Sequence, residues 1–434
     1  MILEELIFFL YRAAIYILPL FGTIFLGWVA FKLWVHYIRQ DFISGIEFIL
    51  LEIIPPREVL RSPKAMELFF TNALYHWSNK GGKEEYWQGA VWFWFSLEIA
   101  SIDGQVHFYL RTPSRLRSLI ETQMYAQYPQ AHVKVVEDYT LAVDHISDHS
   151  AWRAWGCEFG LAKPEAYPIK TYTDFGLDKD PKEEFKVDPI SPIIELFGSL
   201  QKGEQAWVQI VITPSKKAYK TPGKWFTWHD WVTQADMEIK KMLEPYTKYS
   251  ERPSHPGEMS REVRVPKYMD DLVDGMSTKV TKLGFETGIR LVYVAKRESF
   301  NMNTRRNIRL IFRQYAKPNS NEFVRMNSSQ GDAYGGTFTL PDHKVTKLTA
   351  RVVHEYQERS FYHVPLRHHL FSEHALWMHW PISRFFLAYK HHQTFVLNVE
   401  ELATLWHFPG QILKVPTLER IESKEASPPT NLPI

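Results

Sequence analysis

Apolar and polar positions alternate from residue 91 to residue 139 in a pattern that predicts three strands and one helix. Every second residue is apolar through most of VWFWFSLEIAS and QVHFYLR, which indicates strands with two different faces. The apolar positions are Phe93, Phe95, Leu97 and Ile99 in the first run, and Val106, Phe108 and Leu110 in the second. Asp103-Gly104 joins these runs and favours a tight hairpin turn. A helix is predicted after Thr112-Pro113, and the run AHVKVVEDY forms the last strand.

A buried strand and another helix are predicted immediately before this unit. The run GIEFILLEIIPP ends at a proline pair, and Ser62-Pro63 then begins a helix with one apolar side. Together the elements follow the order β-α-β-β-α-β over residues 44–140. That order is typical of a ferredoxin-like module, which is an antiparallel sheet with two helices on one face.

The same order of elements recurs over residues 165–327, without visible sequence identity between the two halves. An insertion at residues 215–281, with a helix near residues 230–243, separates the middle strands of this second copy. We therefore predict an α+β fold with two tandem ferredoxin-like modules. The second copy is predicted from the strands YPIKTYTDF, QAWVQIVIT and FETGIRLVYVA, helices after Asp188-Pro189 and over 300–316, and a short strand at 322–324.

The chain beyond residue 327 follows no repeated pattern. Residues 328–415 are rich in histidine and aromatic residues, with a predicted helix over 342–360. The run TFVLNVEELATLWHFPG predicts a short strand and a helix, because Asn398 and Glu401 have the spacing of a capping box. Residues 416–434 are polar and proline-bearing, which is typical of a linker.

An uncharged run near the N-terminus predicts a membrane helix. The run AAIYILPLFGTIFLGWVAF would span roughly 28 Å as a helix, close to the thickness of the hydrocarbon core. We predict a single transmembrane helix over residues 13–35 after a flank at 1–12. The acidic start MILEELIFF does not fit a cleaved signal, although a buried soluble helix remains an alternative. More cationic residues follow the run than precede it, so we expect the bulk of the chain in the cytoplasm.

Composition sets few limits on function. The chain has 51 Lys+Arg against 49 Asp+Glu, and this near-neutral balance does not require a polyanionic partner. The single cysteine, Cys157, excludes an internal disulfide and fits a reducing compartment. We interpret it as a small apolar residue rather than a nucleophile.

No spacing of residues indicates an acid–base pair, a nucleophile or a cofactor site, so we predict a protein that is not an enzyme. The histidines of FYHVPLRHHLFSEHALWMHW lack the i, i+4 pairing and HExxH signature of zinc sites. Packing is therefore favoured over metal binding for these side chains. The cluster consists of His363, His368, His369, His374 and His379.

Two groups of cationic residues are candidate contacts for nucleic acid or an acidic partner. One repeats at helical spacing on the helix predicted over 300–316, and the other is interleaved with aromatic residues in the insertion. In both cases a solvated surface is the alternative. The candidates are Arg305, Arg306, Arg309 and Arg313 in the first group, and Lys216, Lys217, Lys220 and Lys224 in the second.

The run LNVEELATLWHFP, followed by an NLP-containing tail, resembles the stretch just before the motor domain in conjugation-type ATPases of the HerA-FtsK/type IV secretion class. The middle of the chain, SLEIASIDGQVHFYLRTPSRLRSLIETQMYAQYPQA, is similar to uncharacterised single-pass membrane proteins of candidate-phylum bacteria. The resemblance runs from about residue 40 to the C-terminus. It implies a motor-docking segment with Glu400, Glu401, Leu402, Leu405, His407 and Pro409.

The chain lacks the motor's own signature. No G-x-x-x-x-G-K-[ST] string occurs, and that loop is what holds the phosphates of a nucleotide. The resemblance therefore implies a membrane-anchored scaffold subunit of a type IV secretion-like or conjugative DNA-transfer machine that docks a separate motor ATPase. A membrane-tethered single-stranded nucleic-acid-binding protein is the alternative, and a metallohydrolase built on the histidine cluster is a third hypothesis. Homo-oligomerisation stays open.

Overall fold

The computed structural model describes residues 2–56, 59, 61–75, 81–178, 187–215, 217–224, 227–252, 255–263, 265–328, 342–362 and 394–410. The chain forms two compact units. The anchor unit contains Met1–Glu47 and Trp77–Phe93, and the sheet unit contains Phe48–His76 and most of the chain from Trp94 onward. The predicted histidine cluster, the loop after residue 328 and the tail at 416–434 lie outside the described residues.

One long helix dominates the anchor unit. Helix α1 (Ile2–Ser44) continues through Pro19 and includes the predicted flank as well as the predicted membrane segment. Over Pro19–Ser44 it is long and apolar enough to cross a membrane. The short helix α3 (Gly82–Tyr86) belongs to the same unit.

The first half of the sheet is built from residues 48–136. Its strands are β1 (Phe48–Ile54), β2 (Phe95–Ile102), β3 (Gln105–Pro113) and β4 (His132–Val136). They lie in the order β4-β1-β3-β2, and every neighbouring pair is antiparallel. Helices α2 (Lys64–Phe69) and α4 (Arg117–Gln127) connect β1 to β2 and β3 to β4.

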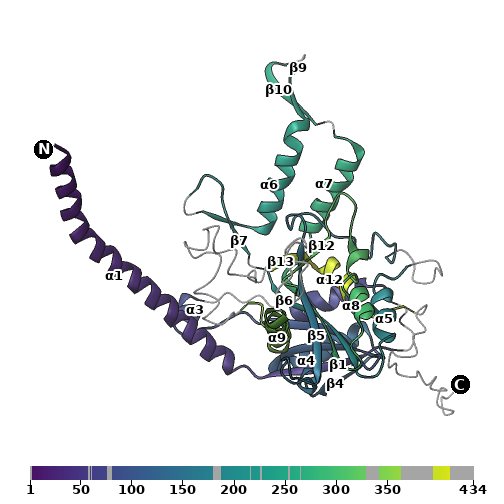
Figure 1. The fold of residues 1–434 in the computed structure, drawn as a ribbon. Coiled ribbons are helices and arrows are strands. Elements are labelled where there is room, and N and C mark those ends of the chain that lie inside the picture. The colour runs from purple at the N-terminus through teal and green to yellow at the C-terminus, as the bar shows by residue number, and fades with distance from the viewer. Residues whose placement is uncertain are drawn as a thin grey trace, which may run out of the picture. The chain divides into compact units, whose positions relative to one another are not determined.

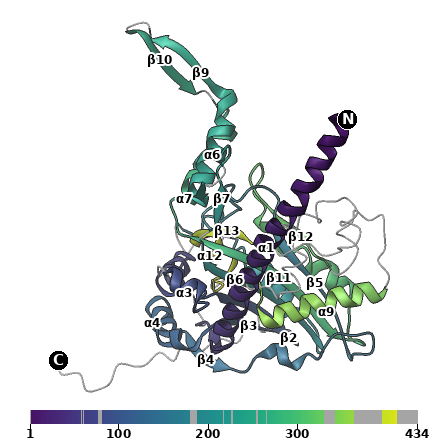
Figure 2. The same cartoon turned by 90° about the vertical axis from the view of Figure 1, so that its left-hand side faces the viewer.

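The second half of the sheet repeats that order of strands. Its strands are β5 (Trp152–Leu161), β6 (Glu204–Pro214), β11 (Gly284–Lys296) and β12 (Phe323–Met326), in the order β12-β5-β11-β6. Helix α5 (Ser191–Gly198) connects β5 to β6, and α8 (Met302–Ile308) lies between β11 and β12. Antiparallel pairing of β2 with β6 joins the halves into one sheet, and β13 (Phe395–Asn398) pairs with β11 (Figures 1 and 2).

The two faces of the sheet are covered differently. Residues that alternate along the strands, such as Leu97, Ile99 and Phe108, enter the large core beneath α2, α4, α5, α8 and α12 (Val399–Leu405). On the opposite face, Tyr109 and Trp207 belong to a smaller core under α9 (Asp342–Glu358). Figure 2 shows α9 lying across this second face. The predicted helix over 342–360 and the predicted alternation of β2 and β3 are thus confirmed.

The predicted hairpin at Asp103-Gly104 is also confirmed. Both residues have positive φ, 53° and 84°, as the tight turn requires. The turn is fastened to the neighbouring half, because the Asp103 carboxylate accepts a hydrogen bond of 2.6 Å from the backbone N–H of Gly203.

The insertion between β6 and β11 forms an arm. It contains a small hairpin of β7 (Ala218–Lys220) and β8 (Trp228–Asp230), then α6 (Trp231–Leu243), the hairpin of β9 (Thr247–Arg252) and β10 (His255–Val263), and α7 (Lys267–Val280). Helices α6 and α7 lie side by side, with β9 and β10 at their far end (Figures 1 and 2). The helix predicted near residues 230–243 is confirmed, with Asp230 as its N-cap.

The first strand predicted for the second half was wrong. Residues 167–175 form turns rather than a strand, and the strand is β5, WRAWGCEFGL. Side chains of α12 bond this segment instead: the Thr404 hydroxyl accepts from the backbone N–H of Tyr172, and Glu400 accepts from the Thr171 hydroxyl. The true strand was missed because it is buried on both faces and its glycines interrupt the apolar run.

The helix predicted over residues 300–316 is shorter than expected. Helix α8 ends at Ile308, and a 3-10 turn at Arg313–Tyr315 follows after a break. Arg305 and Arg306 therefore lie on α8, whereas Arg309 and Arg313 lie beyond its end. The four arginines do not form one continuous helical stripe.

Candidate functional site

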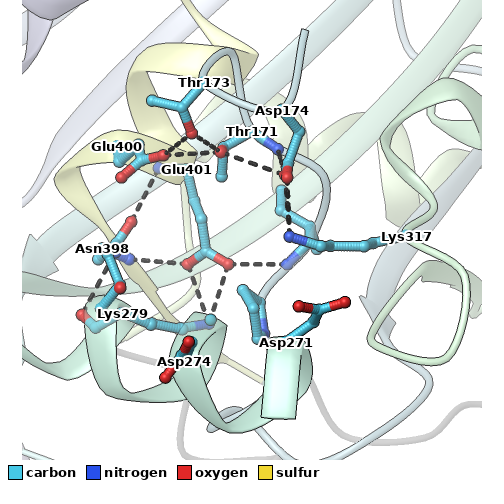
Figure 3. Close-up of a pocket in the computed structure, with 14 residues that line it drawn as sticks. Thr171, Thr173, Asp174, Asp271, Asp274, Lys279, Lys317, Asn398, Glu400 and Glu401 are labelled. Atoms are coloured by element: carbon cyan, nitrogen blue, oxygen red, sulfur yellow. Dashed lines mark hydrogen bonds and ion pairs between the residues drawn. The ribbon is translucent and has the colours of Figure 1, made fainter. Parts of the chain in front are cut away.

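A cavity of about 500 Å³ lies in the sheet unit where α7, the turn at residues 168–174 and α12 meet. We call it the junction cavity. Figure 3 shows carboxylate, hydroxyl and ammonium groups from these three segments pointing toward one another. Its polar lining includes Thr171, Thr173, Asp174, Lys279, Lys317, Asn398, Glu400 and Glu401.

The N-terminus of α12 orients two of the acidic side chains. Asn398 accepts from the backbone N–H of Glu401 at 2.8 Å, and Glu401 accepts from the backbone N–H of Asn398 at 3.0 Å. This reciprocal pair is the predicted capping box, and it satisfies backbone donors that a helix start leaves unpaired. It also holds the Glu401 carboxylate toward α7 and the turn.

Glu401 is the fully buried centre of the cluster. Its carboxylate lies 2.9 Å from the Lys279 ammonium, and the two side chains are 0% and 1% exposed. The same carboxylate accepts from the backbone N–H of Ile169 at 3.0 Å. One side chain thus joins α12, α7 and the 168–174 turn.

Glu400 joins α12 to the 168–174 turn and to Lys282, which follows α7. It accepts from Thr171 at 2.7 Å and from Thr173 at 2.6 Å, and it lies 2.7 Å from the Lys282 ammonium. Burial by itself raises the pKa of Glu400, but Lys282 and the two hydroxyls favour the ionised form and lower that pKa below its usual value. Lys282 also pairs with Glu67 of α2 at 3.1 Å.

Most of the polar groups named above contact one another across the junction, while Asp271 and Asp274 of α7 also line the cavity. Glu400 and Glu401 are occupied by internal ion pairs and hydrogen bonds, and Asp174 at the rim lies 2.8 Å from Lys317. Within the described ranges, no group of three or more His, Cys, Asp or Glu side chains is arranged to hold a metal ion. We therefore interpret the junction cavity as a structural junction between the arm and the sheet.

The segment predicted to dock a motor lies in the interior of the described sheet unit. Leu402 and Leu405 belong to the large core, and His407 is 2% exposed with its Nε2 3.0 Å from Asp188. The apolar and acidic pattern that suggested a partner surface instead packs α12 against the chain's own helices. The buried set comprises Glu400, Glu401, Leu402, Leu405, His407 and Pro409.

A second cavity, of about 360 Å³, gathers cationic side chains at the β12 edge of the sheet. We call it the basic groove. Arg309 and Arg313 line it together with Arg325 of β12, whereas Arg305 and Arg306 do not. Its apolar lining includes Leu310, Phe312 and Phe323. The structure therefore brings two predicted arginines to one site and adds Arg325, which no helical spacing could indicate.

The lysines of the insertion do not form one cationic surface among the described residues. Lys217 pairs with Glu165 and donates to the carbonyl of Thr394 at 2.8 Å. Lys220 lies in β7, and Lys224 lies in the turn that follows it. Lys216 falls outside the described residues.

Sequence comparison places most of the chain in a family. The family model described as domain of unknown function DUF8128 matches residues 93–419, well over half of the chain. The chain belongs to the DUF8128 family. The DUF8128 match begins just before β2 and includes both cavities and α12. A search of curated proteins returned no match.

A buried ionic cluster of the DUF8128 region was not predicted. Arg359 follows α9 with a positive φ of 54° and reaches Glu98 of β2 at 2.9 Å, with side chains 1% and 0% exposed. It also pairs with Asp138. Burial raises the pKa of Asp138, but Arg359 and Thr140 outweigh that effect and lower it below its usual value. No local pattern in the sequence indicates that Glu98 and Arg359 form a pair.

Acid should weaken the junction through Glu400. Because its pKa in the folded DUF8128 protein is lower than in the unfolded chain, Glu400 stabilises the fold above its unfolded pKa. That stabilisation is lost as pH falls below about 5 through the lower folded pKa. We expect Glu400→Gln to lower the melting temperature at pH 7 and to flatten its decline in acid.

The measurement is thermal unfolding followed by circular dichroism between pH 7 and pH 3. Glu358→Gln is the matched control, because Glu358 has a 45% exposed side chain at the end of α9. If the melting temperatures of wild type and Glu400→Gln fall equally steeply with decreasing pH, Glu400 does not cause the loss of stability in acid.

Proposed function

We propose that this protein is a membrane-anchored, non-catalytic docking subunit that holds a separate motor ATPase of a secretion-like or conjugative DNA-transfer machine. The observation that carries the proposal is the antiparallel pairing of β2 with β6, from Phe95↔Ile212 to Ile102↔Gln205. This pairing makes one continuous platform from two half-sheets, and the chain joins that platform to an apolar helix. The internal engagement of Glu400 and Glu401 supports a structural role for the junction.

We further propose that the halves are two ferredoxin-like modules. Each half has the chain order β-α-β-β-α-β, and in each the first strand lies between the third and the fourth. The orders β4-β1-β3-β2 and β12-β5-β11-β6 are the same arrangement. In this proposal β5 begins the second module, ahead of the boundary at residue 165 expected from sequence.

The basic groove is the surface that fits a partner best. Among the described residues, Arg309, Arg313, Arg325 and Glu322 line the groove, and clustered guanidinium groups of this kind can bind an acidic ligand. It lies beside β12, the last strand of the described sheet on that side. A strand at a sheet edge can bind an extended segment through its backbone, while pockets select the side chains. We assign the groove to an acidic, extended segment of the motor.

Reversing charge in the groove should disrupt docking. We expect the full-length Arg309→Glu/Arg313→Glu variant to recover at least about tenfold less P-loop ATPase than wild type from native membranes, a loss of about 1.4 kcal/mol in binding. The measurement is detergent pull-down with quantitative mass spectrometry and an assay for ATP hydrolysis.

Arg117→Glu is the control for this experiment. Arg117 is 49% exposed on α4 and pairs across one helical turn with Glu121, so its loss should affect stability little. Equal recovery of the ATPase by all three proteins would exclude the groove as the docking surface. Repeated absence of any ATPase from the wild-type sample would exclude the function itself.

Binding of single-stranded nucleic acid is the second candidate, and the same groove favours it. Arginines beside aromatic side chains can bind phosphates and stack on bases. This candidate predicts retention of a single-stranded oligonucleotide by wild type that falls steeply with salt and is lost in Arg309→Glu/Arg313→Glu. Binding that is absent, or equal in the variant, would reject it.

We propose a cytoplasmic position for the sheet unit. More basic residues follow the apolar run than precede it, which is the bias expected of a cytoplasmic flank. Those after it are Lys32, His36 and Arg39, and the one before it is Arg12. Protease added to spheroplasts should leave the sheet unit intact until the membrane is opened. Digestion in sealed spheroplasts would reverse the orientation.

A further inference from the structure

We propose that residues 81–93 of the anchor unit, here called the collar segment, form a second contact with the bilayer. In this proposal Tyr86 and Trp87 lie in the headgroup region beside α1. The partner is therefore the lipid surface. The inference rests on α1 spanning the membrane, which is part of the proposed function.

The collar segment is seated directly on α1. The ring of Tyr86 stacks on Phe31 with 6.0 Å between centroids, and Glu85 lies 3.0 Å from the guanidinium of Arg39. Gly89 lies against the backbone of Ile38. Phe31, Ile38 and Arg39 share one helical face with Val35, and Val35 and Ile38 are only 6% and 8% exposed.

Gly89 makes the close approach possible. Its φ is +65°, a conformation that L side chains rarely adopt, and a Cβ at this position would overlap the carbonyl of Ile38. Glycine satisfies both requirements at once. The packing of the collar segment on α1 is thus determined by a backbone contact as well as by side chains.

The contacts determine the depth of the collar segment. From Phe31 to Arg39 they extend about 12 Å along the helix axis. The membrane segment predicted from sequence ends at residue 35, so these contacts lie on both sides of its end. When the apolar part of α1 spans the hydrocarbon core, the Tyr86 contact lies just inside that boundary and the Glu85 contact just outside it.

The exposed side chains at this level have the composition of a membrane interface. Trp87 is 70% exposed and Tyr86 is 43% exposed, and α1 exposes Trp34 and Tyr37 around the same level. Exposed tryptophan and tyrosine at the end of an apolar helix are typical of the headgroup region, where one part of the ring is apolar and the other hydrated. In water, this much adjoining aromatic surface would be unfavourable.

Spin labels in the full-length chain, reconstituted in phosphatidylcholine/phosphatidylglycerol nanodiscs, test the proposal. The only cysteine, Cys157, is fully buried, so wild type serves as the labelling blank. Labels are placed by Trp87→Cys, by Phe25→Cys within α1 and by Leu141→Cys at an exposed position of the sheet unit. Collision with oxygen, which concentrates in lipid, is compared with collision with a water-soluble nickel complex.

We expect the label at position 87 to show an oxygen-to-nickel ratio between those at positions 25 and 141. A ratio at 87 equal to that at 141, with position 25 in lipid, would overturn the collar proposal alone. Water exposure at position 25 as well would overturn the membrane anchor, and with it the proposed function.

A glycine pair provides the matched control. Adding Gly89→Ala should move the label at position 87 toward the aqueous ratio, because the collar segment can no longer seat on Ile38. Adding Gly22→Ala should leave the ratio unchanged, because a Cβ at Gly22 meets no atom within 4 Å. An unchanged ratio in the Gly89→Ala protein would contradict the proposed seating.

Discussion

Arg359→Met should destabilise the sheet unit by about 3–5 kcal/mol, because it breaks the buried ion pairs that Arg359 makes with Glu98 and Asp138. Arg359 reaches Glu98 at 2.9 Å with both side chains almost fully buried. Glu98 keeps hydrogen bonds from Ser96 and Tyr139 in the variant, at 2.6 and 2.8 Å, but these do not replace a charge. The expected consequence is a weakened attachment of α9 to the second face of the sheet.

Denaturant unfolding of the full chain in detergent measures the loss, and amide hydrogen exchange locates it in α9. Arg351→Met is the control from the same helix, since Arg351 pairs with Glu355 one turn away and is 31% exposed. We expect that control to lie within about 1 kcal/mol of wild type. An Arg359→Met protein as stable as the Arg351→Met protein would show that the buried cluster does not hold α9.

Lys279→Met should cost a similar amount, about 3–5 kcal/mol, at the junction cavity. The change removes the ammonium group that lies 2.9 Å from the Glu401 carboxylate and leaves that buried carboxyl group without its ion-pair partner. Glu401 also accepts from the backbone N–H groups of Ile169 and Asn398, so the loss should spread to the 168–174 turn and to α12. Amide exchange should rise in both segments and in α7.

A double-mutant cycle separates the ion pair from the packing. The double variant Lys279→Met/Glu401→Gln leaves no unpaired charge. We expect it to recover part of the stability that Lys279→Met loses, because replacing both partners of a buried ion pair destabilises a protein less than removing one. Lys317→Met is the surface control, since Lys317 and Asp174 are about one-third exposed. If the free-energy loss of the double variant equals the sum of the losses of Lys279→Met and Glu401→Gln, the two groups are not coupled.

The elements with a strong local pattern could be predicted from the sequence. The Asp103-Gly104 turn, the alternation of β2 and β3, and the Asn398–Glu401 capping box each involve neighbouring residues only. β5 could not be predicted in the same way. It is buried by partners distant in sequence, and its glycines lie under side chains of other elements, as Gly156 does under Val352.

The structure groups the candidate site residues differently from their spacing along the chain. The spacing of Arg305, Arg309 and Arg313 indicates a common helix face only if the helix continues to residue 316. In the structure α8 ends at Ile308, and the groove contains Arg309 and Arg313 together with Arg325 from a strand. The 400–409 segment has the composition of a partner surface, and only its packing in the core shows that it is interior. Composition does not distinguish an apolar face that binds the chain itself from one that binds another protein.

The sequence by itself determined that this chain has an apolar N-terminal helix and an α+β body whose middle strands are separated by an insertion. These features follow from hydrophobic periodicity and turn residues, which act over a few positions. Only the tertiary structure decided that β2 and β6 join the halves, that Arg359 reaches Glu98, and that Glu401 joins α12 to Lys279. Each of these contacts links residues more than 100 positions apart, and backbone pairing and buried charge depend on distance in space rather than on order along the chain.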